Sequence, residues 1–214
     1  MTKGRLIAFE GLDGSGKTTQ MDLLGRWLEL QHISYVRTRE PGGTPPGQEI
    51  RQLLLNRPDL AITPLAEAFL FQADRAQHFA TLVLPELANG KVVITDRCLD
   101  SSIAYQGGAR GLGMERIEQL SLLATQNHVP DLTILLDLDP MNVHVRTDVS
   151  QDINGYREQQ NHFDKESEQF HRRLRAAFLT LARAHPERIK VIDASQAVEQ
   201  IHQEIVALVS KLVL

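Results

Sequence analysis

The sequence predicts an α/β fold in which helices cover both faces of a parallel sheet. Five short apolar runs recur along the 214 residues, and helix-like stretches separate them. This alternation favours parallel strands, because each parallel pair needs a crossover that a helix usually supplies. Polar or glycine-rich text follows every run. Ligands of such sheets bind beyond the carboxyl ends of the strands, so we expect a site along that edge.

The predicted strands share a short, apolar and partly β-branched character. They occupy residues 5–9, 34–38, 91–95, 132–138 and 189–193. The text after them reads EGLDGSGKT, REPGGT, DRCLDSS, DLDP and DAS. TPLAEAFLFQADRAQHFATLVLPEL at 63–87 predicts one long helix, and 199–214 predicts an amphipathic helix that covers the sheet. The length suits one domain, so we expect residues 1–214 to form a single unit.

The first strand end carries a phosphate-binding pattern. EGLDGSGKTT at residues 10–19 fits G-x-x-x-x-G-K-[ST] between a strand-like and a helix-like run. Glycine lets the backbone curl with its N–H groups inward, where they and the helix N-terminus suit a chain of phosphates. A simple glycine-rich turn would not explain the flanking strand and helix. The predicted nucleotide-binding residues are Gly11, Asp13, Gly14, Ser15, Gly16, Lys17, Thr18 and Thr19.

Two residues of this loop have predicted chemical roles. Lys17 would reach the β- and γ-phosphates, and the Thr18 hydroxyl would bind Mg²⁺. At the end of the third run, Asp96 is placed as an acid near that ion, and Arg97 offers a planar fork for the oxygens of a second phosphate group. The alternative for Asp96 and Arg97 is a surface ion pair. Lys17, Asp96 and Arg97 are our candidate catalytic residues in this region.

The long helix carries a weaker signal. Phe71 and Arg75 are four residues apart and share a face, so they could stack a nucleobase and bond its carbonyl. Taken alone, an aromatic side chain at this helical spacing is more often part of the core. Arg51, Arg75 and Arg97 are candidate ligands of an anionic acceptor, although nothing in the sequence makes them converge. The polar stretch at 146–169 predicts an exposed loop or lid, with a non-functional insertion as the alternative.

Composition excludes several classes of protein. The formal net charge of −4 argues against a general nucleic-acid surface. No run approaches the ~18 apolar residues of a membrane span. The single cysteine, Cys98, fits a reducing compartment. The first strand begins almost at once, which leaves no room for a signal peptide. We therefore expect a cytoplasmic protein.

Six motifs together resemble one family. FEGLDGSGKTTQ, TREPGGT, LFQADRAQH, DRCLDSSIAYQGGARGL, PDLTILLDLDP and IDAS occur in the order and spacing of the thymidylate kinases, from about residue 5 to about residue 210. The resemblance implies a P-loop NTPase fold with a five-stranded parallel sheet and a mobile lid. It implies transfer of the γ-phosphoryl group of ATP to dTMP with Mg²⁺, giving dTDP and ADP. It also implies a homodimer.

The resemblance also implies roles for single residues around the acceptor. Asp13 matches the acid that bonds the 3′-hydroxyl of dTMP. Arg39 and Arg97 match arginines near the acceptor phosphate, with Arg51 as a companion. Phe71 matches the ring that stacks on thymine, and Arg75 the group that reads its O4. The pocket wall corresponds to Ser101, Ser102, Tyr105 and Gln106, of which Tyr105 would crowd a ribose 2′-hydroxyl.

The resemblance extends to the donor nucleotide and the lid. Asp193, Ala194 and Ser195 resemble the loop that lines the adenine of ATP, and Arg146 resembles the arginine that covers that ring. The lid is placed at about 146–162. Family members with this kind of P-loop usually carry a catalytic arginine in the lid, where this chain has His162. We expect Arg157 to substitute from a shifted position; the other candidates are His162, Lys165 and Arg146.

Other P-loop proteins are less compatible with the sequence. The guanine-reading Asn-Lys-x-Asp of regulatory GTPases is missing, and so is the Ser-Gly-Gly-Gln signature of transporter ATPases. Another nucleoside or nucleoside-monophosphate kinase stays open as an enzymatic alternative. A module that binds ATP without catalysis is the non-enzymatic alternative.

Overall fold

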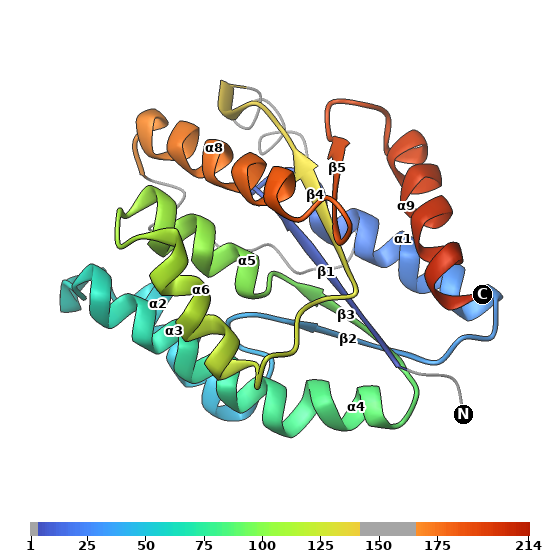
Figure 1. The fold of residues 1–214 in the computed structure, drawn as a ribbon, viewed down its shortest axis with the longest axis horizontal. Helices are drawn as coiled ribbons and strands as arrows, with labels where there is room; N and C mark the ends of the chain where they lie inside the picture. The colour runs from blue at the N-terminus through green and yellow to red at the C-terminus, as the bar shows by residue number, and fades with distance from the viewer. Residues whose placement is uncertain (1–3, 142–165) are drawn as a thin grey trace.

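A computed structural model describes residues 4–141 and 166–214 of the chain. Its strands form one parallel sheet in the order β2-β3-β1-β4-β5 (Figure 1). The strands are β1 (Arg5–Gly11), β2 (Tyr35–Arg39), β3 (Val92–Asp96), β4 (Leu132–Asp137) and β5 (Ile189–Asp193). Each strand begins and ends within two residues of its predicted run. The predicted α/β fold with a five-stranded parallel sheet is therefore confirmed.

Helices cover both faces of the sheet because side chains of a strand alternate between the faces. In β1, Ile7 and Phe9 join a core with α1 (Lys17–Leu30) and α9 (Val198–Val213). Leu6 and Ala8 join the opposite core. Helices α3 (Pro64–His78), α6 (Met114–Ala124) and α8 (Glu168–Ala184) contribute to that second core. Figure 1 shows α1 and α9 together on one side of the sheet. Helix α9 thus covers the sheet, as predicted for residues 199–214.

The predicted helix at 63–87 is continuous but changes its winding. Helix α3 passes into the π-helical η2 (Phe79–Val83) and then into α4 (Leu84–Ala88), with αR backbone angles at each junction. Pro85 explains the change, because proline has no N–H and its ring clashes with the carbonyl four residues earlier in a regular α-helix. A wider turn before the proline accommodates both effects.

Shorter elements surround the carboxyl edge of the sheet. They are α2 (Pro45–Asn56), η1 (Pro58–Leu60), α5 (Leu99–Ser102) and the π-helical η3 (Ile103–Ala109). In the sheet, β1 lies between β3 and β4, and Phe9 pairs with Asp96. The loop after β1 and the turn after β3 therefore leave the sheet side by side, although about 85 residues separate them in sequence.

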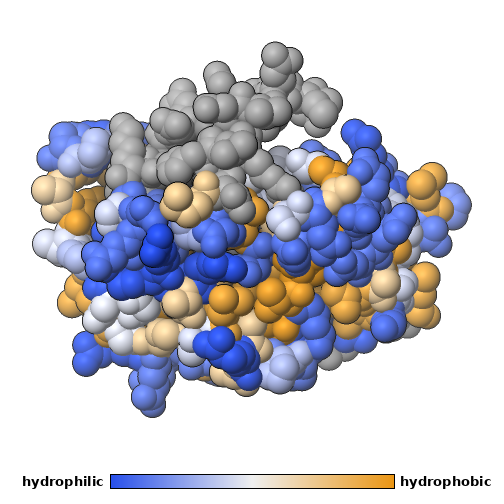
Figure 2. All heavy atoms as spheres, turned by 90° about the horizontal axis from the view of Figure 1, so that it is seen from above, coloured by the Kyte–Doolittle hydropathy of each residue, from blue (hydrophilic) through white to orange (hydrophobic). Residues whose placement is uncertain are grey.

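Seen from above, the molecule presents a largely hydrophilic face with smaller apolar patches (Figure 2). None of the helices within 4–141 and 166–214 is long and apolar enough to cross a membrane.

Candidate active site

The loop between β1 and α1 curls tightly around its own lysine. Gly11, Gly14 and Gly16 have φ values of 136°, 76° and 96°, a region that L side chains rarely adopt. Lys17 is buried, and its Nζ donates hydrogen bonds to the carbonyl oxygens of Gly11 at 3.3 Å and Leu12 at 3.0 Å. The glycines are thus required by the backbone path, which leaves the N-terminus of α1 facing the carboxyl edge of the sheet.

An open pocket of about 630 Å³, including its solvent-open part, lies beside this loop. All ten predicted acceptor-site residues and Asp96 line it, as do Glu40, Pro41 and Leu55, which the sequence did not indicate. The predicted ones are Asp13, Arg39, Arg51, Phe71, Arg75, Arg97, Ser101, Ser102, Tyr105 and Gln106. The convergence of arginines that the sequence could not establish is therefore present.

Arg97 joins the loop after β1 to the pocket. Its Nη2 lies 2.6 Å from Asp13 Oδ1, and its Nη1 donates to the carbonyl of Gly11 at 3.1 Å and to Ser101 Oγ at 3.2 Å. Its guanidinium carbon lies 5.2 Å from the centre of the Tyr105 ring. The backbone of Arg97 has a φ of 67°, a conformation with a steric cost that proteins often accept at functional sites.

Arg97 keeps its positive charge, because its surroundings raise its pKa. Burial alone would lower the pKa of Arg97, but Tyr105, Asp13 and Asp96 raise it to well above its ordinary value. A permanently charged guanidinium therefore faces the pocket next to the loop after β1.

Glu10 fixes the turn that presents Arg97. It is fully buried in β1, and its Oε1 accepts hydrogen bonds from the backbone N–H groups of Cys98 at 2.8 Å and Ser101 at 3.1 Å. Ser101 Oγ donates to Oε2 at 2.5 Å. Burial raises the pKa of Glu10 to about 7, although nearby Arg97 acts in the opposite direction. The sequence signal for this role was an acid directly after the apolar run 5–9, which the structure extends to Gly11, because a buried carboxyl group needs partners.

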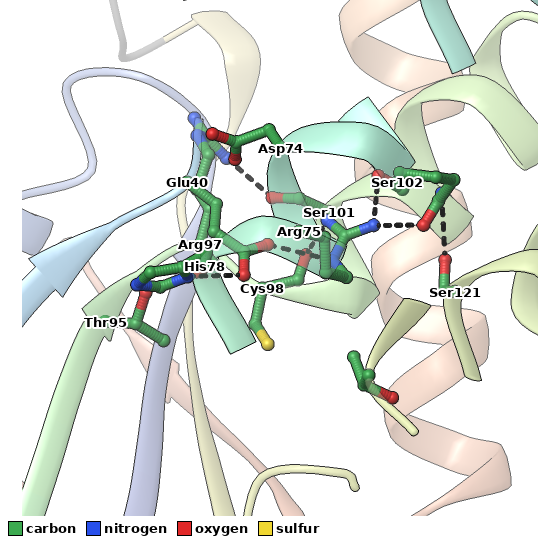
Figure 3. A network of polar contacts seen from close by, with 12 residues as sticks. Glu40, Asp74, Arg75, His78, Thr95, Arg97, Cys98, Ser101, Ser102 and Ser121 are labelled. Atoms are coloured by element: carbon green, nitrogen blue, oxygen red, sulfur yellow. Dashed lines mark hydrogen bonds and ion pairs between the residues drawn. The ribbon is translucent and has the colours of Figure 1, made fainter. Parts of the chain in front are cut away.

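Arg75 is the most buried cation of the pocket (Figure 3). Its Nε donates to Glu40 Oε2 at 2.8 Å, and its Nη1 donates to Gln72 Oε1 at 2.8 Å and Ser102 Oγ at 3.1 Å. Its Nη2 donates to the carbonyl of Cys98 at 3.1 Å. Four of its five N–H groups thus bond described residues, which fixes the plane of the guanidinium and leaves one N–H on Nη2.

A second layer of buried acids and a histidine supports Arg75. Glu40 Oε1 lies 2.9 Å from His78 Nδ1, and His78 Nε2 lies 2.8 Å from Thr38 Oγ1. Burial alone would raise the pKa of Glu40, but Arg75 and His78 lower it overall. Burial, with a contribution from Glu40, raises the pKa of the adjacent Asp74 to about 6. Figure 3 shows this group packed between β2, β3 and α3.

The predicted donor-nucleotide residues are spread along the same edge of the sheet. Thr18 and Thr19 are exposed in the first turn of α1. At the end of β5, Asp193 Oδ1 accepts a hydrogen bond from the N–H of Ser195 at 2.8 Å, and Ala194 donates to the carbonyl of Asp137. These last residues do not line the pocket, because β5 is two strands from β1.

Two further observations concern predicted residues. Asp96 Oδ1 is buried and has no hydrogen-bond partner within the described ranges. The predicted lid at 146–162, with Arg146, Arg157, His162 and Lys165, lies outside the described residues.

Comparison with known proteins decides the family. The sequence model of the family described as thymidylate kinase matches residues 9–205 of this chain. The chain belongs to the thymidylate kinase family. A thymidylate kinase of Bifidobacterium longum strain NCC 2705 is 50% identical over 201 residues, which cover 92% of this chain and 93% of the relative. The resemblance inferred from the motifs is confirmed.

More distant thymidylate kinases agree with this assignment. That of Leifsonia xyli subsp. xyli is 49% identical over 202 residues, covering 94% of this chain and 92% of the relative. The crystal structure of thymidylate kinase from Ehrlichia chaffeensis has a TM-score of 0.76 and 32% identity, and the match covers 97% of this chain and 98% of that chain. The fold and its family are therefore supported by sequence and structure independently.

Proposed function

We propose that this thymidylate kinase family member transfers the γ-phosphoryl group of ATP to dTMP, in the supply of dTTP. An oxygen of the acceptor phosphate bonds the γ-phosphorus while the bond from the β,γ-bridging oxygen to that phosphorus breaks, so dTDP and ADP leave. The observation that carries the proposal is the contact between Asp13 and Arg97, which joins the phosphate loop to a pocket lined by arginines and an aromatic ring. No general base is needed, because the acceptor oxygen is already anionic.

The donor side uses the loop after β1. The N–H groups of that loop, Lys17 and the N-terminus of α1 hold the phosphates of ATP. The loop Asp193–Ser195 lines the adenine of ATP, and Arg146 covers that ring. Arg97, Arg39 and Arg51 bring the acceptor phosphate toward the donor, because their charges offset the repulsion between two anions. Catalysis here consists of positioning and charge stabilisation.

A magnesium ion fits the residues at this edge. Mg²⁺ in phosphoryl-transfer sites takes few protein ligands and completes its shell with phosphates and water. Among the described residues, no group of three or more acidic, histidine or cysteine side chains is arranged to hold a metal ion, which agrees with an open site of this kind. Thr18 and the unpartnered oxygen of Asp96 would hold the ion, directly or through water. When bound, it would neutralise charge on the β- and γ-phosphates.

On the acceptor side, Phe71 stacks on the thymine ring and Arg75 donates to its O4. Asp13 accepts a hydrogen bond from the 3′-hydroxyl, and Tyr105 fills the space that a 2′-hydroxyl would need. Ser101, Ser102 and Gln106 complete the wall. The position of all these groups around one pocket supports the assignment.

For the lid we propose Arg157 as the residue that stabilises the transferring phosphoryl group. A well-placed arginine contributes about 10³- to 10⁵-fold in rate. The variant R157A should therefore lose about 10³-fold in kcat, while H162A, as the matched control, retains most activity. A kcat of R157A within about twofold of the parent would remove Arg157 from the mechanism.

We also propose a cytoplasmic homodimer. Leu65 and Phe69 on α3 are 48% and 53% exposed. Ala73, Ala76 and Ala80 continue this exposed apolar stripe along the same helix, and we call the five residues the α3 face. An exposed apolar stripe of this kind is typical of a surface that meets a partner. A second copy of the chain is the partner that the family resemblance implies.

The function is tested by incubating the protein with ATP, Mg²⁺ and a panel of nucleosides and nucleoside monophosphates while ADP release is measured. We expect release with dTMP at the highest kcat/KM. Release with another acceptor in preference to dTMP would support a different nucleotide kinase. ATP binding without acceptor-dependent release would support a binding module and overturn the proposal.

A further inference from the structure

We propose that Glu67 is a positioning residue that fixes the orientation of the Gln106 amide and thereby selects the pyrimidine edge that the pocket accepts. The proposal rests on the function proposed above, because it concerns the base of the acceptor nucleotide. Gln106 lies in η3 and lines the pocket. Glu67 lies on α3 behind that wall and does not line the pocket.

One short contact links the two residues. Gln106 Nε2 donates a hydrogen bond to Glu67 Oε1 at 2.9 Å, and both side chains are buried. A carboxylate accepts hydrogen bonds and cannot donate them. If the amide of Gln106 turned over, its oxygen would face the carboxylate oxygen of Glu67 without a proton between them. The chemistry of Glu67 therefore determines which end of the amide faces it.

Arg110 anchors Glu67 from the other side. Its Nη2 lies 3.4 Å from Glu67 Oε2, and its Nη1 lies 2.6 Å from Glu166 Oε1. Its guanidinium carbon also lies 5.1 Å from the centre of the Phe170 ring. Because Glu67 is bonded at both oxygens, it cannot swing away to release Gln106. The orientation of the amide is thus set by elements outside the pocket.

The consequence appears at the base. With its nitrogen turned to Glu67, Gln106 has its carbonyl oxygen available to the pocket as an acceptor. The wall also contains Arg75, which can only donate. An acceptor next to a donor complements the N3–H and O4 of thymine or uracil. Cytosine presents an acceptor at N3 and a donor at its 4-amino group, so both of its contacts would be mismatched. A buried mismatch is expensive, because neither partner can return to water.

The test compares kcat/KM for dTMP and dCMP in the parent and in two variants. In E67Q the new amide can accept or donate, so Gln106 can turn its nitrogen toward the pocket. We expect the ratio of dTMP to dCMP to fall by about 10- to 100-fold, with dCMP improving in absolute terms. E67D is the matched control, because it keeps a group that only accepts. Its ratio should stay within about threefold of the parent ratio.

A double-mutant cycle separates this role from a structural one. In the Q106L background the amide is absent, so adding E67Q should leave the ratio unchanged. If Glu67 only supports folding, E67Q lowers thermal stability in both backgrounds and leaves the parent ratio as it was. That result would overturn the proposal. A parent that does not phosphorylate dTMP at all would instead overturn the function on which it rests.

One measurement needs neither a substitution at Glu67 nor turnover. In the parent labelled with [¹⁵N]glutamine, the Gln106 side-chain resonance is assigned by its loss in Q106L. We expect one of its amide protons to be protected from solvent exchange before dTMP is added, and to stay protected afterwards. An amide that gains protection only with dTMP would show that its nitrogen faces the pocket, and the proposal would be wrong.

Discussion

Asp13 Oδ1 lies 2.6 Å from Nη2 of Arg97, although the two residues are 84 positions apart in the chain. Lys17 Nζ lies 3.6 Å from the same oxygen. One carboxylate therefore neighbours both the lysine of the loop after β1 and an arginine that lines the pocket. The contact follows from the sheet, because β1 and β3 are parallel neighbours and their carboxyl ends adjoin.

Asp13→Asn tests the assigned contact with the sugar. The substitution keeps the size of the side chain but makes it a weaker acceptor, because hydrogen bonds to a charged group are stronger than hydrogen bonds to a neutral one. We expect kcat/KM for dTMP to fall about 10- to 100-fold. The matched substrate is 3′-deoxy-dTMP, which lacks the hydroxyl. The parent should prefer dTMP over this analogue, and D13N should show little preference. An unchanged preference in D13N would remove Asp13 from the sugar site.

Base selection should be graded. One buried methyl group discriminates by only about 10- to 200-fold, so dUMP should be a poor but measurable substrate. Arg75 donates where cytosine also donates, so dCMP should be worse than dUMP. Steady-state kcat/KM for the three nucleotides checks this order, with R75K as a control that loses the fixed guanidinium plane. Comparable values for dTMP and dCMP in the parent would contradict the role of Arg75.

Glu10 should make stability depend on pH. Its pKa is raised from 4.5 to about 7, so the folded state binds a proton that the unfolded state releases. Its contribution to stability is complete below pH 4.5 and is lost as the pH rises toward and through 7. The loss is on the order of 3 kcal/mol. Denaturant unfolding of the parent and E10Q at several pH values should show a flatter profile for E10Q. Parallel profiles would contradict a raised pKa of Glu10 in the folded state.

The α3 face should control assembly. Phe69→Glu introduces a charge into the exposed apolar stripe, and a charge is costly to bury without a partner. We expect sedimentation to report dimers for the parent and monomers for F69E, with the unfolding temperature of F69E changing little at low protein concentration. Exposed Leu30 on α1 lies on the opposite side of the sheet, so L30E serves as the control. Dimers that persist in F69E would move the interface elsewhere.

Much of the fold followed from local pattern. Apolar runs predicted the strands because a parallel sheet covered on both faces hides most side chains of its central strands β1, β3 and β4, although the edge strands β2 and β5 are less buried. The π-helical turn at 79–83 was not predicted, since it arises from Pro85 acting on carbonyl groups one turn earlier. The order of the strands in the sheet was not predicted either. It depends on tertiary packing, and the periodicity of one segment does not show which other segments pair with it.

The pocket was predicted unevenly for a physical reason. Arg97 carries a group that binds phosphates, so its chemistry was visible in the sequence, whereas the base-stacking role of Phe71 was favoured only by the family resemblance. Glu40, Glu67 and His78 act only through other side chains, and their roles depend on hydrogen bonds between distant elements. Glu10 follows directly after the predicted run 5–9, and an acid at the end of an apolar strand was the one signal available in advance.

The central claim is that two nucleotides meet across the contact between Asp13 and Arg97. The most direct measurement follows [γ-³²P]ATP with unlabelled dTMP, Mg²⁺ and the purified protein, and separates the nucleotides by chromatography. We predict that the label moves into dTDP in step with ADP formation, and that R97A abolishes nearly all of this transfer. Label that stays in ATP, or appears only as inorganic phosphate, would contradict the account.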